Sequence, residues 1–374
     1  MEPIAEMPAP SGDVPSPRRS VRRHVLVAAG GVLAVLLLWT ALWFYLAGTL
    51  KDGIARWADA RRAEGWSVQW QSLSIGGFPF AWDARFGRPA ATRTGAAPPW
   101  FWRGPETVTL HYRPWSPRTV DLTAPGTHHL GPDATLAEST VTVAARAVDS
   151  RLELDAGGRP KQLSIAVDEA MIAQGTAAPA HVEQLRAIVG AVAPGDPAVE
   201  PHLRATARLE AGIAGLELPE DTKPVLGRTV GRAMLTATLM GAVPPTPPGG
   251  SPPEALARWR DDGGTVEIQH LALGWGPLSV TADGTLALDE RLQPQAALSA
   301  HVAGYGETVD ALLRAGMVKP RAAFIAKLAL GAMAKTPANG GPPEIAVPVT
   351  IQDGKLYVGP AALLVMPRID WNVK

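Results

Sequence analysis

Apolar and polar residues alternate with a period of two along much of the chain. Every even position from Leu278 to Leu288 is apolar or glycine, and the pattern resumes over 296–302 after a turn at Gln293-Pro294. Residues 203–209 alternate in the same way. Successive side chains of a β-strand point to opposite faces, so each stretch offers one face to a core and one to water. The alternation predicts antiparallel sheet with one wetted face.

Helical patterns are fewer. They predict helices over 49–63, 253–261, 307–317, 321–334 and, from a weaker pattern, 181–193. Thr308, followed by Asp310 and an apolar run, has the composition of a helix start. The expected fold is therefore mainly β with a few packing helices, an α+β arrangement of curved antiparallel sheets.

One apolar segment near the start has a different character. Residues 25–47 contain 23 residues and no charge, enough for about 35 Å of helix against a hydrocarbon core of about 30 Å. A cleaved signal peptide has a shorter apolar run and small residues before the cut, where this chain has Tyr45. The segment is expected to be an uncleaved, single-pass transmembrane helix.

Basic residues suggest how this segment is oriented. Four arginines precede it closely, although four Lys or Arg residues also follow within 20 positions. Long domains that follow an anchor are translocated with little regard for charge. We expect a cytoplasmic N-terminus, with the bulk of the protein on the other side of the membrane. The arginines are Arg18, Arg19, Arg22 and Arg23, and the later basic residues are Lys51, Arg56, Arg61 and Arg62.

Proline and glycine divide the rest of the chain. Residues 1–24 are expected to be a disordered cytoplasmic tail, since 1–17 are polar and rich in Pro. Loop compositions recur at 89–99, 244–253 and 336–343. The expected organisation is a tail (1–24), an anchor (25–47), a β-rich subdomain (48–243), a linker (244–253) and a second β-rich subdomain (254–374).

An internal repeat is visible within this pattern. Residues 67–84 align without gaps on 265–282, with 6 identities in 18 positions. In both copies the apolar face changes phase, after Trp70 and after Ile268, as a β-bulge would cause. A duplicated unit of helix, bulged strand, Gly-x-x-Pro turn and return strand is therefore expected. Chance similarity between two amphipathic hairpins is the competing interpretation. The turn residues are Gly76, Pro79, Gly274 and Pro277.

Several motifs accompany the apolar segment. They are Gly65-Trp66, Gly77-Phe78-Pro79-Phe80, Trp259 with Gly263-Gly264, Leu273 to Leu278, Gly284 to Asp289, Gln293-Pro294, Gly354, Gly359-Pro360 and Pro367 to Trp371. As a set they resemble the domain-of-unknown-function family 2125 of bacterial envelope proteins, over most of residues 25–371. The resemblance implies a periplasmic protein anchored in the inner membrane, and it supplies no catalytic residues.

Charge and composition argue against several classes of function. Lys+Arg and Asp+Glu are both 35, which argues against nucleic acid as a partner, and the absence of Cys excludes thiolate catalysis and cysteine metal sites. The common nucleotide, zinc-protease and serine-hydrolase motifs are missing. The pair His128-His129 is expected to have a surface or packing role, and Asp261-Asp262 to end a helix. No enzyme activity, cofactor or metal is expected.

Tryptophan is concentrated early in the chain. Nine of the 12 lie between Trp39 and Trp115. Core packing is one interpretation, because Trp buries a large area. The other is that Trp100, Phe101 and Trp102 form a Pro-flanked loop that touches membrane lipid or an acyl chain.

Two functional hypotheses follow. In the first, the protein is a non-enzymatic envelope factor that binds a lipid-like or otherwise apolar ligand on a curved sheet, because an apolar sheet face needs a ligand or partner to cover it. In the second, it is a structural or scaffolding protein that binds another envelope protein through a sheet edge.

Overall fold

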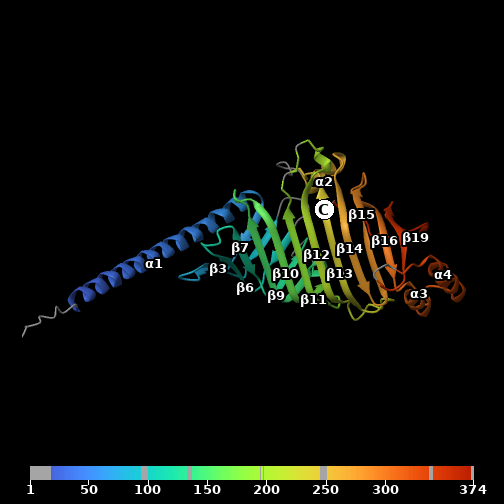
Figure 1. The fold of residues 1–374 in the computed structure, drawn as a ribbon, viewed down its shortest axis with the longest axis horizontal. Helices are drawn as coiled ribbons and strands as arrows, with labels where there is room; N and C mark the ends of the chain where they lie inside the picture. The colour runs from blue at the N-terminus through green and yellow to red at the C-terminus, as the bar shows by residue number, and fades with distance from the viewer. Residues whose placement is uncertain are drawn as a thin grey trace, which may run out of the picture. The chain divides into compact units, whose positions relative to one another are not determined.

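The computed structural model describes residues 18–93, 100–132, 137–193, 195–196, 198–244, 251–336 and 340–371 (Figure 1). Its contacts divide the chain into two compact units, Met1–Ile54 and Ala55–Lys374. The tail expected over 1–17 and parts of the expected loops at 89–99, 244–253 and 336–343 lie outside the described residues.

Helix α1 (Arg18–Ala63) joins the expected anchor and the expected helix 49–63 into one element. It contains no proline, and from Leu26 on it is long and apolar enough to cross a membrane. Its apolar side chains lie mostly open rather than packed, with Leu26 73% and Leu38 72% exposed. A core helix of a soluble protein would have most of these side chains buried.

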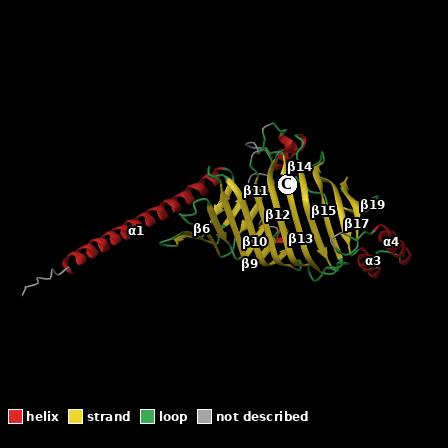
Figure 2. Ribbon diagram, in the orientation of Figure 1, coloured by secondary structure: helices red, strands yellow, loops and turns green. Residues whose placement is uncertain are grey.

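The second unit is dominated by one antiparallel sheet (Figure 2). The first strands are β1 (Trp66–Gln69), β2 (Ser72–Gly76), β3 (Trp82–Gly87), β4 (Ala90–Arg93), β5 (Trp100–Arg103), β6 (Thr107–Tyr112), β7 (Thr119–Thr123) and β8 (Gly126–Gly131). The later strands are β9 (Val141–Leu154), β10 (Pro160–Gln174), β11 (Ala180–Ala191), β12 (Ala205–Glu217), β13 (Thr229–Met240), β14 (Thr265–Trp275), β15 (Leu278–Leu288), β16 (Pro294–Ala303), β17 (Glu344–Gln352), β18 (Lys355–Val358) and β19 (Ala361–Val365).

Three further helices accompany these strands. They are α2 (Pro252–Asp261), α3 (Tyr305–Arg314) and α4 (Pro320–Met333). From β9 onward each strand pairs with the next along the chain, so that the sheet is a meander, drawn from green to red in Figure 1.

Before β9 each line of chain across the sheet is divided by a short break into two strands, such as β1 and β2. β1 pairs with β4 while β2 pairs with β3, and the same division continues through β5 to β8. β9 joins the two halves, because Val141–Ala145 pair with β8 and Asp149–Glu153 with β7. Pro89, Pro105 and Pro125 lie at three of the four interruptions. Proline has no amide hydrogen to give to a ladder, which explains breaks at these positions.

Most of the expected elements are confirmed. β15 has the bounds expected from alternation, 296–302 lies within β16, and 205–209 of the expected segment 203–209 lies within β12. Three of the predicted helices correspond to α2, α3 and α4. The loop expected over 89–99 is wrong in part, because Ala90–Arg93 form β4.

The helix expected over 181–193 is wrong, because Ala180–Ala191 form β11. Val182 and Leu185 pack into the same apolar cluster although they are three residues apart. The ladder to β12 skips from Val182 to Gln184, so the strand is irregular at Glu183. This irregularity lets both side chains reach one face and mimics helical spacing.

The two copies of the expected repeat are both hairpins, but they differ in detail. The first strand is broken after Gln69, and the ladder of the second shifts between Ile268 and Leu271. Ile75 lies opposite Ala84, whereas Leu273 lies opposite Val280, so the registers differ by two residues. The duplication itself stays a prediction.

The turns also differ. Gly76 ends β2 and Pro79 lies in the following turn, where the Phe78–Pro79 bond is cis. Pro277 lies in a two-residue turn after Gly276, and Gly274 is inside β14. The sheet also continues across the expected linker 244–253, because β13 and β14 pair along their length. The two β-rich parts therefore share one sheet.

Candidate functional site

One face of the sheet carries a row of apolar residues and one glycine that runs from strand to strand. Residues directly opposite each other in antiparallel strands project to the same face. Followed from strand to strand, the pairings connect one residue on each of β3, β6, β7, and β9 to β18. We call this row the apolar stripe; it consists of Trp82, Tyr112, Val120, Leu152, Leu163, Val189, Leu209, Ala237, Ile268, Gly284, Leu298, Val349 and Val358.

The apolar stripe is only partly shielded. Leu163 on β10 and Val189 on β11 lie opposite each other and are 38% and 46% exposed. Among the described residues no large side chain is less than 2% exposed. Helices α3 and α4 pack on each other, and their main contacts with the sheet are at β15 and β17. The apolar stripe is therefore exposed at β10 and β11, whereas Ala237 and Ile268 further along it are buried.

The opposite face carries a polar row. Asp83 lies opposite His111, which lies opposite Asp121, which lies opposite Arg151. The same line continues through Ser164, Ile188, Glu210, Thr236 and His270. Because adjacent residues of a strand face opposite ways, Val189 belongs to the apolar stripe and Ile188 to the polar row. The two faces of the sheet thus differ sharply in polarity.

Ion pairs organise the polar row. Asp83 Oδ1 lies 2.8 Å from His111 Nδ1, and Asp121 binds Arg151 Nε at 2.7 Å and Arg113 Nη1 at 3.2 Å. The hydrogen bond from Arg151 is the main cause that lowers the pKa of Asp121, and the charges of Arg151 and Arg113 act in the same direction. The carboxylate therefore stays ionised and joins neighbouring strands.

The aromatic residues expected in a loop are placed differently. Trp100, Phe101 and Trp102 belong to strand β5, so the expectation of a Pro-flanked loop is wrong. Phe101 is only 3% exposed and Trp100 is 38% exposed. Trp102 stacks on His128 and donates its indole N–H to Nδ1 at 3.3 Å. Two of the three side chains are thus used in packing.

His128 and His129 project to different neighbours. His128 is 9% exposed, and its Nε2 lies 2.9 Å from the Ala124 carbonyl. Because the indole N–H of Trp102 can only donate, His128 Nδ1 accepts this hydrogen bond. His129 bonds Thr142 at 3.1 Å. No group of three His, Asp or Glu that could hold a metal ion occurs among the described residues.

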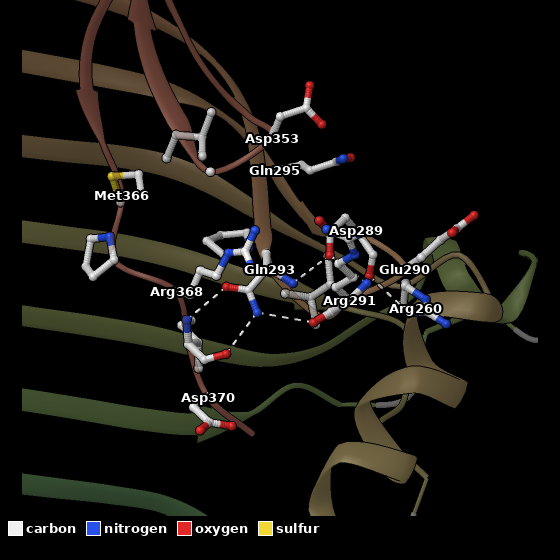
Figure 3. Close-up of a pocket in the computed structure, with 16 residues that line it drawn as sticks. Arg260, Asp289, Glu290, Arg291, Gln293, Gln295, Asp353, Met366, Arg368 and Asp370 are labelled. Carbon is white, nitrogen blue, oxygen red and sulfur yellow. Dashed lines mark hydrogen bonds between the residues drawn. The ribbon is translucent and has the colours of Figure 1, made fainter. Parts of the chain in front are cut away.

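A polar cavity of about 960 Å³ lies where α2, the β15–β16 turn, the β17–β18 turn and the C-terminal segment meet (Figure 3). Gln293 links two of these parts, because its amide bonds the backbone N–H and carbonyl of Ile369, both at 2.9 Å. Trp371 donates to the Leu292 carbonyl at 2.9 Å. These bonds fasten the C-terminal segment to the β15–β16 turn.

Charged side chains of both signs line this cavity. Arg260 donates to the Asp289 carbonyl at 3.0 Å and forms an ion pair with Asp261. Asp289 itself accepts the backbone N–H groups of Arg291 and Gln293, at 2.8 and 2.7 Å. These hydrogen bonds thus go to backbone groups of the β15–β16 turn, and the charged side chains hold the turn and α2 together. The expected role of Asp261-Asp262 is in keeping with this, since Asp262 is the C-cap of α2.

Residues of the apolar stripe were expected only in part from the sequence. Leu209, Gly284 and Leu298 fall in segments where alternation predicts strands. The pattern does not predict the strands β9 to β11, which also contribute to the stripe. β9 and β10 are 14 and 15 residues long, but apolar and polar residues alternate over only parts of 141–154 and 160–174, so the signal there is weak.

A family model described as "Uncharacterized protein conserved in bacteria (DUF2125)" matches residues 43–367, which is most of the chain. No curated protein and no solved structure matches the chain significantly.

Proposed function

Because the chain belongs to the DUF2125 family of bacterial proteins, we propose that it is a membrane-anchored envelope protein that binds a lipid-like ligand along its apolar stripe. The continuous stripe is the observation that carries this proposal. Soluble proteins rarely leave contiguous apolar patches larger than a few hundred Å² uncovered. A row that crosses so many strands and is exposed at Leu163 and Val189 favours an elongated apolar occupant such as an acyl chain.

The strength of such binding can be estimated from buried area. Burying apolar surface contributes about 25 cal/mol per Å², or roughly 0.8 kcal/mol for each methylene group. An acyl chain of ten methylenes would then gain about 8 kcal/mol before the costs of ordering are subtracted. This is ample for a carrier that must also release its cargo.

In this proposal α1 crosses the inner membrane and the sheet lies in the periplasm, within a single-pass protein with a cytoplasmic N-terminus. The uncharged span from Leu26 and the preceding arginines of the sequence support this orientation. A periplasm-specific reporter fused after Lys374 tests it. Activity of that reporter supports the proposal, whereas activity of a cytosol-specific reporter at the same position contradicts it.

We assign the protein a binding role rather than a catalytic one. The ion pairs of the polar row join neighbouring strands, and the charges of the cavity at Gln293 hold turns. The proposal therefore requires no cofactor.

Native mass spectrometry of the full chain, extracted in detergent, tests the ligand. The expected result is an acyl lipid that survives exchange into a second detergent and that is lost on substitution within the apolar stripe. A protein that carries no lipid, or that carries the same load after such substitution, would contradict the proposal.

The sheet edges support a second candidate function. Within the described residues β19 pairs only with β18, and Leu364 and Val365 are 48% and 75% exposed. An open edge of this kind accepts a strand from another protein. Copurification separates the two candidates, because a stoichiometric protein partner in place of lipid would favour a scaffold.

A further inference from the structure

Helix α4 exposes large apolar side chains to solvent. Phe324, Ile325 and Leu328 are 71%, 55% and 67% exposed. At 100° per residue these three lie on one side of the helix, and Ala323, which is 2% exposed, lies on another. α4 packs against α3. The apolar face of a helix normally packs against other parts of a protein, so the exposed apolar side of α4 calls for a partner.

The connection between the two helices extends this surface. Met317 lies between α3 and α4 and is 66% exposed, and Met333 at the end of α4 is 54% exposed. We call the element formed by α3, α4 and their connection the α3–α4 hairpin. Its exposed apolar side chains are Met317, Phe324, Ile325, Leu328 and Met333.

The same segment carries a net positive charge. Residues 305–335 contain five Lys or Arg and two Asp or Glu, in a chain whose net charge is zero. Lys327 pairs with Asp310 at 2.9 Å. Lys319, Arg321 and Lys335 are exposed and form no ion pair within the described residues. A partner that fits this surface therefore offers an apolar region to the exposed apolar side chains and anionic groups to the Lys and Arg side chains.

We propose that the α3–α4 hairpin docks on the surface of an anionic phospholipid bilayer. Helices that lie in such an interface place Phe and Leu at the acyl boundary, and Lys and Arg among the headgroups. Phe324 and Leu328 supply the first kind of contact, and Lys319, Arg321 and Lys335 the second. This docking does not depend on what the apolar stripe binds, so that the two proposals can fail separately.

The absence of cysteine makes a direct test possible. The full chain is reconstituted in phosphatidylcholine nanodiscs, and a single Leu328→Cys substitution carries an environment-sensitive fluorophore. Vesicles of phosphatidylethanolamine and phosphatidylglycerol are then added. The matched control is Met171→Cys, which places the same label at a 50% exposed methionine on β10.

The expected result is a blue-shifted, brighter emission from position 328 with anionic vesicles and no change from position 171. Pure phosphatidylcholine vesicles should give little shift. Combining Arg321→Ala with Lys335→Ala should weaken vesicle binding roughly 25-fold, about fivefold for each charge removed. Raising the salt to 1 M should release the vesicles, because the Debye length falls to about 3 Å.

Three outcomes would overturn the proposal. The label at position 328 could remain unchanged with anionic vesicles, or respond equally to phosphatidylcholine. A shift that occurs without vesicles and rises with protein concentration would instead assign the surface to contact between protein chains.

Discussion

Two adjacent residues of β11 offer a matched test of the apolar stripe. Val189 belongs to the stripe and is 46% exposed, and Ile188 belongs to the polar row and is 37% exposed. Both are apolar and β-branched, and they face opposite sides of one strand. Val189→Asn and Ile188→Asn therefore cost similar strand propensity and differ mainly in the face that they alter.

The expected effects can be worked from exposure. Fully burying a Val or Ile side chain contributes about 1.5–3 kcal/mol, and roughly half of each side chain is already open. Either substitution should therefore lower the free energy of unfolding by about 1 kcal/mol. In the stripe alone, the new amide would be left without a partner beneath a bound acyl chain, at a cost of about 1–3 kcal/mol. That cost corresponds to roughly 5- to 150-fold weaker binding.

Titration of a dansyl-labelled fatty acid into the detergent-purified full chain measures this difference. Because both variants share the same micelle and the same α1, partition of the probe into detergent cancels in the comparison. Thermal unfolding of each variant checks that folding is preserved. Equal loss of binding in the two variants, or no loss in Val189→Asn, would refute the assignment of the ligand to the apolar stripe.

Three further predictions concern stability. Asp121→Asn should lower the free energy of unfolding by about 1 kcal/mol at neutral pH. Because folding lowers the pKa of Asp121, its contribution to stability is present above the ordinary value of 3.8 and is lost as the pH falls through the folded value. The free energy of unfolding should therefore change less with pH in the variant, as an acid titration would measure. Gly264→Ala should lower the free energy of unfolding by about 1–3 kcal/mol in chemical denaturation, because an added Cβ would lie 2.3 Å from the indole of Trp259, which is 3% exposed. The control is Gly306→Ala, because nothing lies within 4 Å of a Cβ added there. Gln293→Ala should release the C-terminal segment, seen as faster amide exchange at Ile369, and unchanged exchange there would contradict the role given to this side chain.

The strands that the sequence predicted well are those with uninterrupted alternation. Leu278–Leu288 is regular along its length and has one wetted face, so its period alone gave its bounds. Over Ala180–Ala191 the irregularity at Glu183 changes the phase of the apolar positions, and the local pattern therefore favoured a helix. Prolines on both sides of Trp100–Arg103 favoured a loop, although the residues between them form a four-residue strand.

The apolar stripe could not be predicted from any one segment. It exists because the register of each pairing places an apolar residue opposite the last, and a shift by one residue would move a strand's side chains to the other face. Register is set by the whole ladder. The exposed side of α4 could not be predicted from the sequence either. An apolar helical pattern predicts burial, and the sequence does not show which sides of the helix are covered by the rest of the protein.

Site-specific photocrosslinking from within β11 tests the central claim most directly. A benzophenone amino acid is placed at position 189 or at position 188 of the full chain in living cells, and the protein is irradiated and examined by mass spectrometry. The account predicts acyl-lipid adducts from position 189 and not from position 188. Adducts from both positions, or only protein adducts from position 189, would contradict it.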